Sequence, residues 1–310
     1  MIPRNALIFH SGGLGDFVLT WPLGLALGRI HPQSRIIYVT QSSKGALAAA
    51  AIGLDFQDAE ASWPALYAPN PAVPDRLRKT LAETHSVFTF LSKPADTFSK
   101  NIAQLAPVAN VYSLRLPPPD NFTASAAEFL LSQLTSAPVL RTAIEQILVS
   151  IRSKGVRNRP PLRSGAPILL HPGAGHRDKC YPLAGFLTLA ERILATGKTV
   201  KILLGEVELE RLPAADIRRL ESAAPLARPA QYVDLLAQLS AAAAFIGNDS
   251  GPTHLAAITG VPTIALFGPT NPVIWRPLGP RIQVLHSPNW TDLSPVQVFQ
   301  TLEQLPETGI

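Results

Sequence analysis

Polar residues suited to binding a phosphorylated ligand gather in one glycine-containing loop late in the chain. The loop reads NDSGP over Asn248–Pro252, between an apolar run at 243–246 and a helical pattern at 253–258. Ser250 stands at the N-cap position of that helix, whose first amides lack internal partners and carry partial positive charge. A phosphate group is therefore a natural ligand of this loop. Asp249, a carboxylate, is suited instead to sugar hydroxyls.

A second glycine loop, HPGAGHRDK over His171–Lys179, also follows a short apolar run and precedes a helical pattern. Such a loop lets backbone amides approach an anion, and we expect those of Ala174 and Gly175 to approach a diphosphate. Lys179 would neutralise its charge. Since helix starts disfavour cations, a lysine there favours an anionic ligand over a merely solvated side chain.

A third glycine loop, SGGLGD over 11–16, lies near the start of the chain and ends in Asp16. It has neither the G-x-G-x-x-G spacing of dinucleotide-binding loops nor the Gly-Lys-Ser/Thr of P-loops. By position alone, Asp16 could be a favourable charge at a helix N-terminus or a functional carboxylate facing a ligand.

The elements that would position these loops alternate between strand and helix. The sequence predicts strands at 6–10, 35–40, 86–91, 109–114, 168–171, 199–204, 243–246, 261–267 and 281–286, and helices at 17–30, 139–153, 182–195, 232–241, 253–258 and 295–305. A Pro- and Arg-rich stretch at 154–167 reads as a linker. We therefore expect two α/β domains, residues 1–155 and 156–310, each opening with a strand, a glycine loop and a helix.

The composition excludes several classes of protein. The net charge is +5, but basic residues are scattered, aromatics are only 7%, and no nucleic-acid-binding motif is present, so we expect no nucleic-acid partner. The single cysteine, Cys180, excludes an internal disulfide and a cysteine metal site. No apolar run reaches the ~20 residues of a membrane span, and no signal peptide is recognised, so we expect a cytoplasmic protein.

Three stretches resemble one known family. NDSGPTHLAAITGVPTIALFGPTNPVIW (248–275) closely resembles the C-terminal signature of glycosyltransferase family 9, the lipopolysaccharide heptosyltransferases. The HPGAG…K…P pattern at 171–182 resembles the family's second motif, and GLGD with Thr20 and Pro22 resembles its N-terminal motif. The resemblance implies the α/β GT-B fold, in which two Rossmann-like domains face each other across a central cleft.

The resemblance also implies roles for individual residues. Asp16 would be the catalytic base, and a glutamate after the strand at 199–204 would bind the ribose; Glu208 is preferred and Glu206 stays open. The amides of Ser250, Gly251 and Thr253 would hold the diphosphate together with Lys179, and Asp249 would bind the donor sugar. His254 would be either a phosphate ligand or a packing residue. No acidic pair has metal-ligand spacing, so we expect no metal or other cofactor.

The implied activity is inverting transfer of a heptose or similar sugar from a nucleotide diphosphate, with ADP-heptose as the family's donor, to a lipopolysaccharide-core or related glycan acceptor. Association with the inner membrane face would suit the basic charge. No residue matches an acceptor site: Lys44, Lys93, Lys100 and Arg115 read more simply as solvated charges. A GT-B sugar-nucleotide epimerase and a non-catalytic sugar-nucleotide binder remain alternatives. A Ser-His-Asp hydrolase does not, since Asp249, Ser250 and His254 share one turn.

Overall fold

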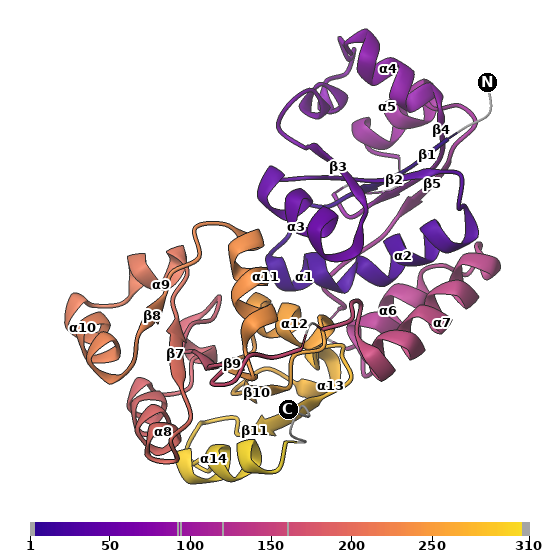
Figure 1. Ribbon diagram of the computed structural model, residues 1–310. Coiled ribbons are helices and arrows are strands. Elements are labelled where there is room, and N and C mark those ends of the chain that lie inside the picture. Colours follow the sequence, from indigo (N-terminus) through magenta and orange to yellow (C-terminus); the bar gives the residue numbers. More distant parts are fainter. Residues whose placement is uncertain (1–3, 92, 94, 120, 160, 306–310) are drawn as a thin grey trace. The chain divides into compact units, whose positions relative to one another are not determined.

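The computed structural model describes residues 4–91, 93, 95–119, 121–159 and 161–305. The chain forms two compact units (Figure 1). The first comprises Met1–Phe122 and Ala126–Leu148, and the second comprises Thr123–Ser125 and Val149–Ile310. The division lies within helix α7 (Pro138–Lys154), before the predicted boundary at residue 155.

The first unit contains a five-stranded parallel sheet in the order β3-β2-β1-β4-β5. Its strands are β1 (Asn5–Phe9), β2 (Arg35–Thr40), β3 (Asp55–Asp58), β4 (Thr84–Thr89) and β5 (Asn110–Ser113). Side chains alternate between the two faces, so Leu7 and Phe9 pack on one side with Leu77 and Phe98. Helices α4 (Asp75–Ala82) and α5 (Thr97–Leu105) cover that face (Figure 1).

The opposite face of this sheet carries α1 (Leu14–Leu19), α2 (Trp21–Ile30) and α3 (Ser42–Ile52), with α6 (Ala126–Ser132) and α7 nearby (Figure 1). The single helix predicted at 17–30 is wrong in detail, because the structure breaks it at Thr20. Pro22 lacks the amide hydrogen that a continuous helix needs, and the Thr20 hydroxyl instead donates to the Phe17 carbonyl at 2.7 Å. The break separates the turn that carries Asp16 from the longer α2.

The second unit contains a six-stranded sheet in the order β11-β10-β9-β6-β7-β8, with every described pairing parallel. Its strands are β6 (Ile168–His171), β7 (Val200–Leu203), β8 (Leu226–Ala227), β9 (Ala244–Asn248), β10 (Thr263–Phe267) and β11 (Ile282–His286). Strands β9 and β6 are central and fully buried, as expected for a parallel sheet covered on both sides.

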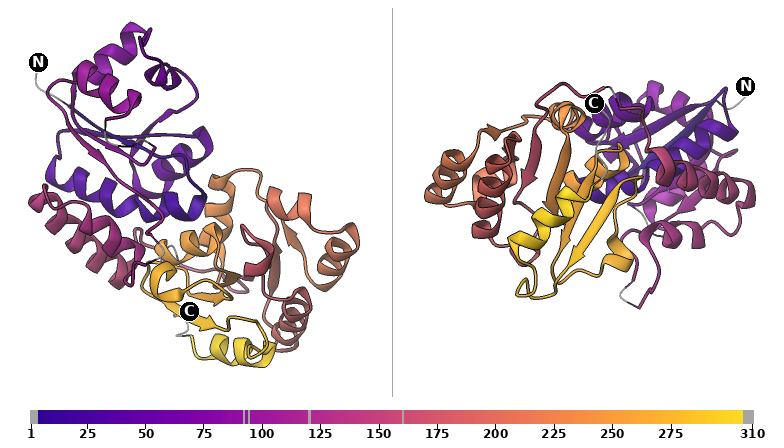
Figure 2. Two further views of the ribbon diagram at one scale, coloured as in Figure 1. Left: turned by 180° about the vertical axis from the view of Figure 1, so that it is seen from behind. Right: turned by 60° about the horizontal axis from the view of Figure 1, so that its bottom comes forward.

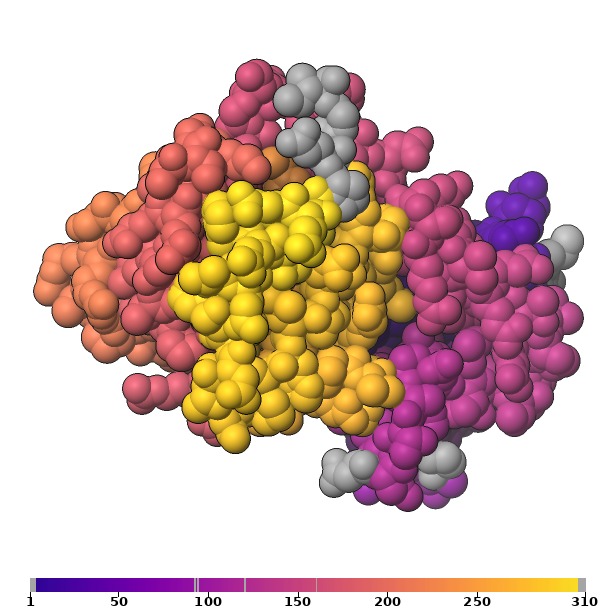
Figure 3. Space-filling model, turned by 90° about the horizontal axis from the view of Figure 1, so that it is seen from below, coloured from indigo at the N-terminus to yellow at the C-terminus, as the bar shows by residue number. Residues whose placement is uncertain are grey.

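Helices cover this sheet in two layers, which Figures 1 and 2 show from three sides. One layer holds α8 (Leu183–Ala195), α10 (Ala214–Ala223) and α14 (Pro295–Glu303), with Phe186, Leu220 and Val298 in its core. Helices α8 and α14 pack together, and their surfaces adjoin in Figure 3. Helices α11 (Tyr232–Ala241) and α12 (Gly251–Ile258) pack on the other side, while α9 (Glu206–Arg211) and α13 (Pro272–Trp275) follow β7 and β10.

The predicted linker at 154–167 contains Pro160, which lies outside the described residues. Its other residues after Lys154 form neither helix nor strand. Within the described ranges, no helix combines the length and apolarity that crossing a bilayer requires.

Candidate functional site

Two glycine-containing loops leave neighbouring strands at the centre of the second sheet. Strands β6 and β9 are paired in register, with His171 opposite Gly247. Because the strands are parallel, the loops that follow them emerge at the same edge of the sheet, where ligand sites of α/β folds form. The predicted PGAG and NDSG loops are therefore brought together by the fold.

Asn248, at the end of β9, joins the two loops. Its side-chain amide donates to the carbonyls of Pro172 at 2.8 Å and Gly173 at 3.2 Å, and its oxygen accepts the Tyr181 amide at 2.9 Å. The residue is completely buried, so all three bonds are shielded from water. Asn248 thereby holds the PGAG loop against β9, a role that sequence reasoning missed although the residue lies inside the recognised signature.

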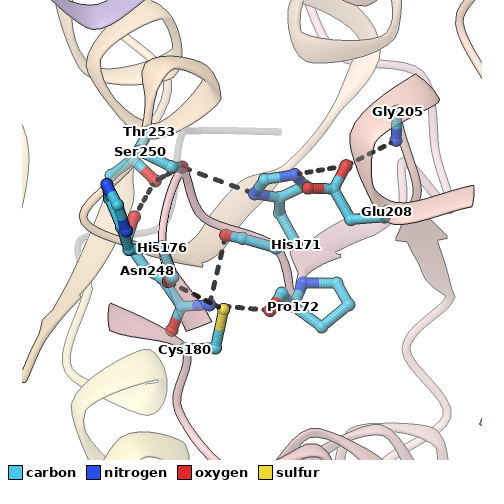
Figure 4. A network of polar contacts seen from close by, with 10 residues as sticks. His171, Pro172, His176, Cys180, Gly205, Glu208, Asn248, Ser250 and Thr253 are labelled. Atoms are coloured by element: carbon cyan, nitrogen blue, oxygen red, sulfur yellow. Dashed lines mark hydrogen bonds and ion pairs between the residues drawn. The ribbon is translucent and has the colours of Figure 1, made fainter. Parts of the chain in front are cut away.

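Helix α12 begins where the sequence predicts a helix N-terminus. Ser250 is the N-cap and Gly251 the first helical residue, but the Ser250 side chain does not cap the helix. Its hydroxyl instead contacts the Thr253 hydroxyl at 3.1 Å and His171 Nδ1 at 3.4 Å, while the Thr253 hydroxyl donates to the Asn248 carbonyl (Figure 4). Because the Ser250 side chain does not accept from them, the first amides of α12 can donate to an external acceptor.

His171 connects Ser250 to Glu208, as Figure 4 shows. His171 Nε2 lies 3.5 Å from Glu208 Oε2, and the same carboxylate accepts the Gly205 amide at 2.9 Å. Burial raises the pKa of Glu208, but the hydrogen bonds from His171 and Gly205 outweigh it and hold the pKa below its ordinary value. Glu208 is buried and Glu206 exposed, so Glu208 is the glutamate that belongs to this network.

The same network explains why residue 173 is a glycine. A Cβ atom at Gly173 would overlap with the Glu208 carboxylate, so a side chain at this position would displace the glutamate. His171 and Gly173 both lie in the loop that was singled out, yet only their pairing with a distant glutamate gives them their roles. That contact depends on tertiary structure and has no local signal in the chain.

Asp249 is the centre of a second charged cluster at the same edge of the sheet. It accepts from Lys179 Nζ at 2.9 Å and lies 3.7 Å from His254 Nε2. Burial raises the pKa of Asp249, whereas His254 and Lys179 lower it, and the balance leaves the pKa below its ordinary value. The predicted diphosphate cation and the predicted sugar-binding acid are therefore partners. His254 is buried and packs beside them.

The amides predicted to approach a diphosphate from the PGAG loop differ in their surroundings. Ala174 is buried, and burial raises the pKa of the Cys180 thiol, an effect that the Ala174 backbone opposes but does not outweigh. Gly175 faces open space, and its carbonyl accepts from Arg211 Nη1 at 2.9 Å.

In the first unit, Asp16 lies in the first turn of α1, because the helix begins at Leu14 rather than at the predicted residue 17. The expectation that Lys44 is a solvated charge is wrong. Lys44 is only 4% exposed, and its ammonium donates to the Gly12 carbonyl at 2.6 Å. Its interior position follows from the placement of α3 beside the glycine loop, which local pattern does not reveal. Lys93, Lys100 and Arg115 are exposed.

No group of three or more His, Cys, Asp or Glu side chains lies together as a metal site among the residues that the structure describes. Near the two glycine loops, positive charge is supplied by Lys179 and by the N-terminus of α12.

Most of the second unit is similar to a known protein family. Residues 151–302 match the model of glycosyltransferase family 9 (heptosyltransferase). Among curated proteins, the chain is 31% identical over 113 residues to lipopolysaccharide heptosyltransferase 3 of Escherichia coli, covering 36% of this chain and 33% of the relative. It is 38% identical over 110 residues to lipopolysaccharide heptosyltransferase 1 of Pseudomonas aeruginosa, covering 35% and 30%. The matches thus span about a third of these relatives' length.

Solved structures resemble the chain over nearly its whole length. The Escherichia coli ADP-heptose lipopolysaccharide heptosyltransferase II superposes with a TM-score of 0.68 at 17% identity, covering 97% of both chains. An Escherichia coli heptosyltransferase with ADP superposes with a TM-score of 0.65 at 15% identity, covering 97% of this chain and 99% of the other. These likenesses confirm the predicted GT-B fold.

Proposed function

Since residues 151–302 belong to glycosyltransferase family 9, we propose that this chain is an inverting glycosyltransferase. It transfers a heptose or similar sugar from a nucleotide diphosphate, with ADP-heptose as the expected donor, to a lipopolysaccharide-core or related glycan acceptor. One observation carries the proposal: a chain of contacts from the buried Glu208 through the buried His171 to Ser250 links a carboxylate to the N-terminus of α12. A nucleotide diphosphate has ribose hydroxyls and phosphates that match these two ends.

The donor contacts follow from the chemistry of each group. Glu208 accepts hydrogen bonds from the ribose, and the amides of Ser250, Gly251 and Thr253 face the diphosphate together with that of Gly175. Lys179 neutralises the diphosphate while staying within reach of Asp249, which accepts from hydroxyls of the donor sugar.

The reaction needs few protein groups. The acceptor hydroxyl oxygen attacks the anomeric carbon, the bond from that carbon to the diphosphate oxygen breaks, and the nucleotide diphosphate leaves with the bonding electrons. Asp16 takes the proton of the acceptor hydroxyl as general base. Lys179 and the start of α12 stabilise the negative charge that develops on the leaving diphosphate. No metal is required in this scheme.

We place this activity in the cytoplasm, at the inner membrane face. A glycolipid acceptor would be anionic and membrane-bound, and a chain with a net charge of +5 is attracted to such a surface.

Calorimetric titration with ADP, GDP and UDP tests the donor site, and a transfer assay with ADP-heptose tests the reaction. We expect ADP to bind, and Lys179→Met to weaken it about tenfold or more, since a charge-assisted hydrogen bond contributes roughly 1.5–3 kcal/mol. Lys198→Met removes an exposed lysine of the same unit and should change nothing.

Asp16→Ala should bind ADP as wild type does and lose transfer. Binding without transfer by the wild type, with any acceptor glycan, would leave a sugar-nucleotide binder, and epimerised donor would identify an epimerase. Absence of nucleotide binding would refute the donor site itself.

A further inference from the structure

Lys44 is the most deeply buried lysine that the structure describes, and it lies beside the glycine loop of the first unit. It is the third residue of α3, and its Nζ donates to the Gly12 carbonyl at 2.6 Å. That distance marks a strong, charge-assisted bond. The bond joins α3 to the loop that precedes the α1 turn of Asp16, although Lys44 and Gly12 are 32 residues apart.

A cation at this position is disfavoured twice. The first turn of a helix carries partial positive charge, and burial removes water from the ammonium. Burial accordingly lowers the pKa of Lys44, and the nearby Asp16 carboxylate opposes the shift. Packing alone would be served better by an apolar side chain of this length, so the charge needs another explanation.

The other titratable neighbour does not supply a competing charge. His10, directly after β1, is 2% exposed, and burial together with Lys44 lowers its pKa to about 3. It is therefore neutral at physiological pH. Lys44 is then the cation of a cluster that also contains Asp16, His10 and the Gly12 carbonyl.

Gly12 is confined between these groups. A Cβ atom built on it would lie 3.0 Å from the His10 ring and 3.3 Å from Asp16 Oδ2. The backbone at Gly12 thus runs directly past the Asp16 carboxylate, and Lys44 holds its carbonyl from the α3 side. Any movement of Lys44 would shift the loop on which Asp16 depends.

We propose that Lys44 is a positioning residue for Asp16: its ammonium fixes the glycine loop through the Gly12 carbonyl and places a positive charge beside the Asp16 carboxylate. The inference rests on the proposed function, in which Asp16 must be ionised to accept the proton of the acceptor hydroxyl. It adds a residue to which neither the family signature nor the charge pattern pointed.

Three substitutions separate the effect of the Lys44–Gly12 hydrogen bond from the effect of the Lys44 charge. Lys44→Met removes both, Lys44→Gln keeps a hydrogen-bond donor but no charge, and Lys44→Arg keeps the charge. Lys100→Met, an exposed lysine of the same unit, is the matched control. We expect Lys44→Met to lower kcat about tenfold or more, which is part of the roughly 10²–10⁴-fold that a general base contributes. Lys44→Gln should lower it less, and Lys44→Arg should restore part of the loss. ADP affinity should be unchanged throughout.

The acid limb of the kcat–pH profile is the readout that a purely structural role would not move. In Lys44→Gln it should shift upward by about one pH unit, since an opposite charge close to a carboxylate lowers its pKa by roughly 1–3 units. An unshifted limb with wild-type kcat would overturn the proposal. A raised acceptor KM with wild-type kcat would also overturn it, by showing that Lys44 binds the acceptor.

A second measurement does not depend on activity. The Asp16 carboxyl can be titrated by NMR in ¹³C-aspartate-labelled protein and assigned with Asp16→Asn. Its pKa should rise by about one unit in Lys44→Gln relative to wild type and to Lys100→Met. An unchanged pKa would refute the proposal even if no transfer is found, whereas a raised pKa in a protein without transferase activity would uphold it while the proposed function failed.

Discussion

Asp249 illustrates how the partners of a single residue stabilise its charge at the edge of the second sheet where β6 and β9 end. Its side chain is 5% exposed and is held by Lys179 and His254, so its ionised form is stabilised only while those partners are present. Removing one member of a fully buried ion pair costs roughly 3–5 kcal/mol. Lys179 keeps 29% of its side chain exposed, which brings the expected cost down to about 1–3 kcal/mol.

This leads to a prediction about pH. Because the pKa of Asp249 is lower in the folded state than in the unfolded chain, its stabilisation is present above the unfolded pKa and is lost as the pH falls through the folded one. Asp249→Asn should therefore be less stable than wild type at neutral pH, and the difference should shrink below about pH 4. Thermal unfolding over a pH series measures it; a constant difference would contradict the assignment.

Residue identities were predictable where a motif carried them. Ser250 and Gly251 lie at a helix start as predicted, and Glu208 rather than Glu206 turns inward. Lys44 and His171 could not be assigned from the chain, because their roles depend on partners brought close only by folding. A buried lysine and a solvated one look alike in sequence.

At the scale of elements, the fit of α9 against the loop after β6 gives a further prediction. Gly173→Ala places a Cβ on the Glu208 carboxylate and should cost about 1–3 kcal/mol, the range for overpacking a buried site. It should also weaken ADP binding by moving Glu208.

Gly175→Ala is the matched control for stability alone, since a Cβ there meets no protein atom, and Lys198→Met is the control for ADP binding. Chemical denaturation and calorimetry give the two quantities. Equal unfolding free energies for Gly173→Ala and Gly175→Ala would show that the Gly173–Glu208 contact is unimportant.

Elements were predictable in proportion to their apolar pattern. Helix α11 matches its predicted range of 232–241, and β2 matches 35–40, because each has a clear period. Strands β3 and β8 were missed. The first is a largely exposed edge strand with acids at both ends, and the second has only two residues, so neither contains an apolar run. The break between α1 and α2 depends on Pro22, whose effect was underestimated.

At the scale of the whole molecule, the positive charge at the proposed donor site predicts that transfer does not depend on metal ions. Lys179 and the start of α12 supply the positive charge that a metal would otherwise bring to a diphosphate. Transfer should therefore persist in excess EDTA, with a change in rate of less than about twofold, and added Mg²⁺ should not raise it. Activity lost to EDTA and restored by a divalent cation would refute this scheme.

The pairing of β6 with β9 has a kinetic consequence. Asn248 and Pro172, which it brings together, are 76 residues apart, and closing so long a loop carries an entropic cost that must be met before either glycine loop takes its shape. The proposed nucleotide site therefore forms only after β6 and β9 have paired. A nucleotide that recognises only the paired loops would prolong the lifetime of the native protein without hastening its formation.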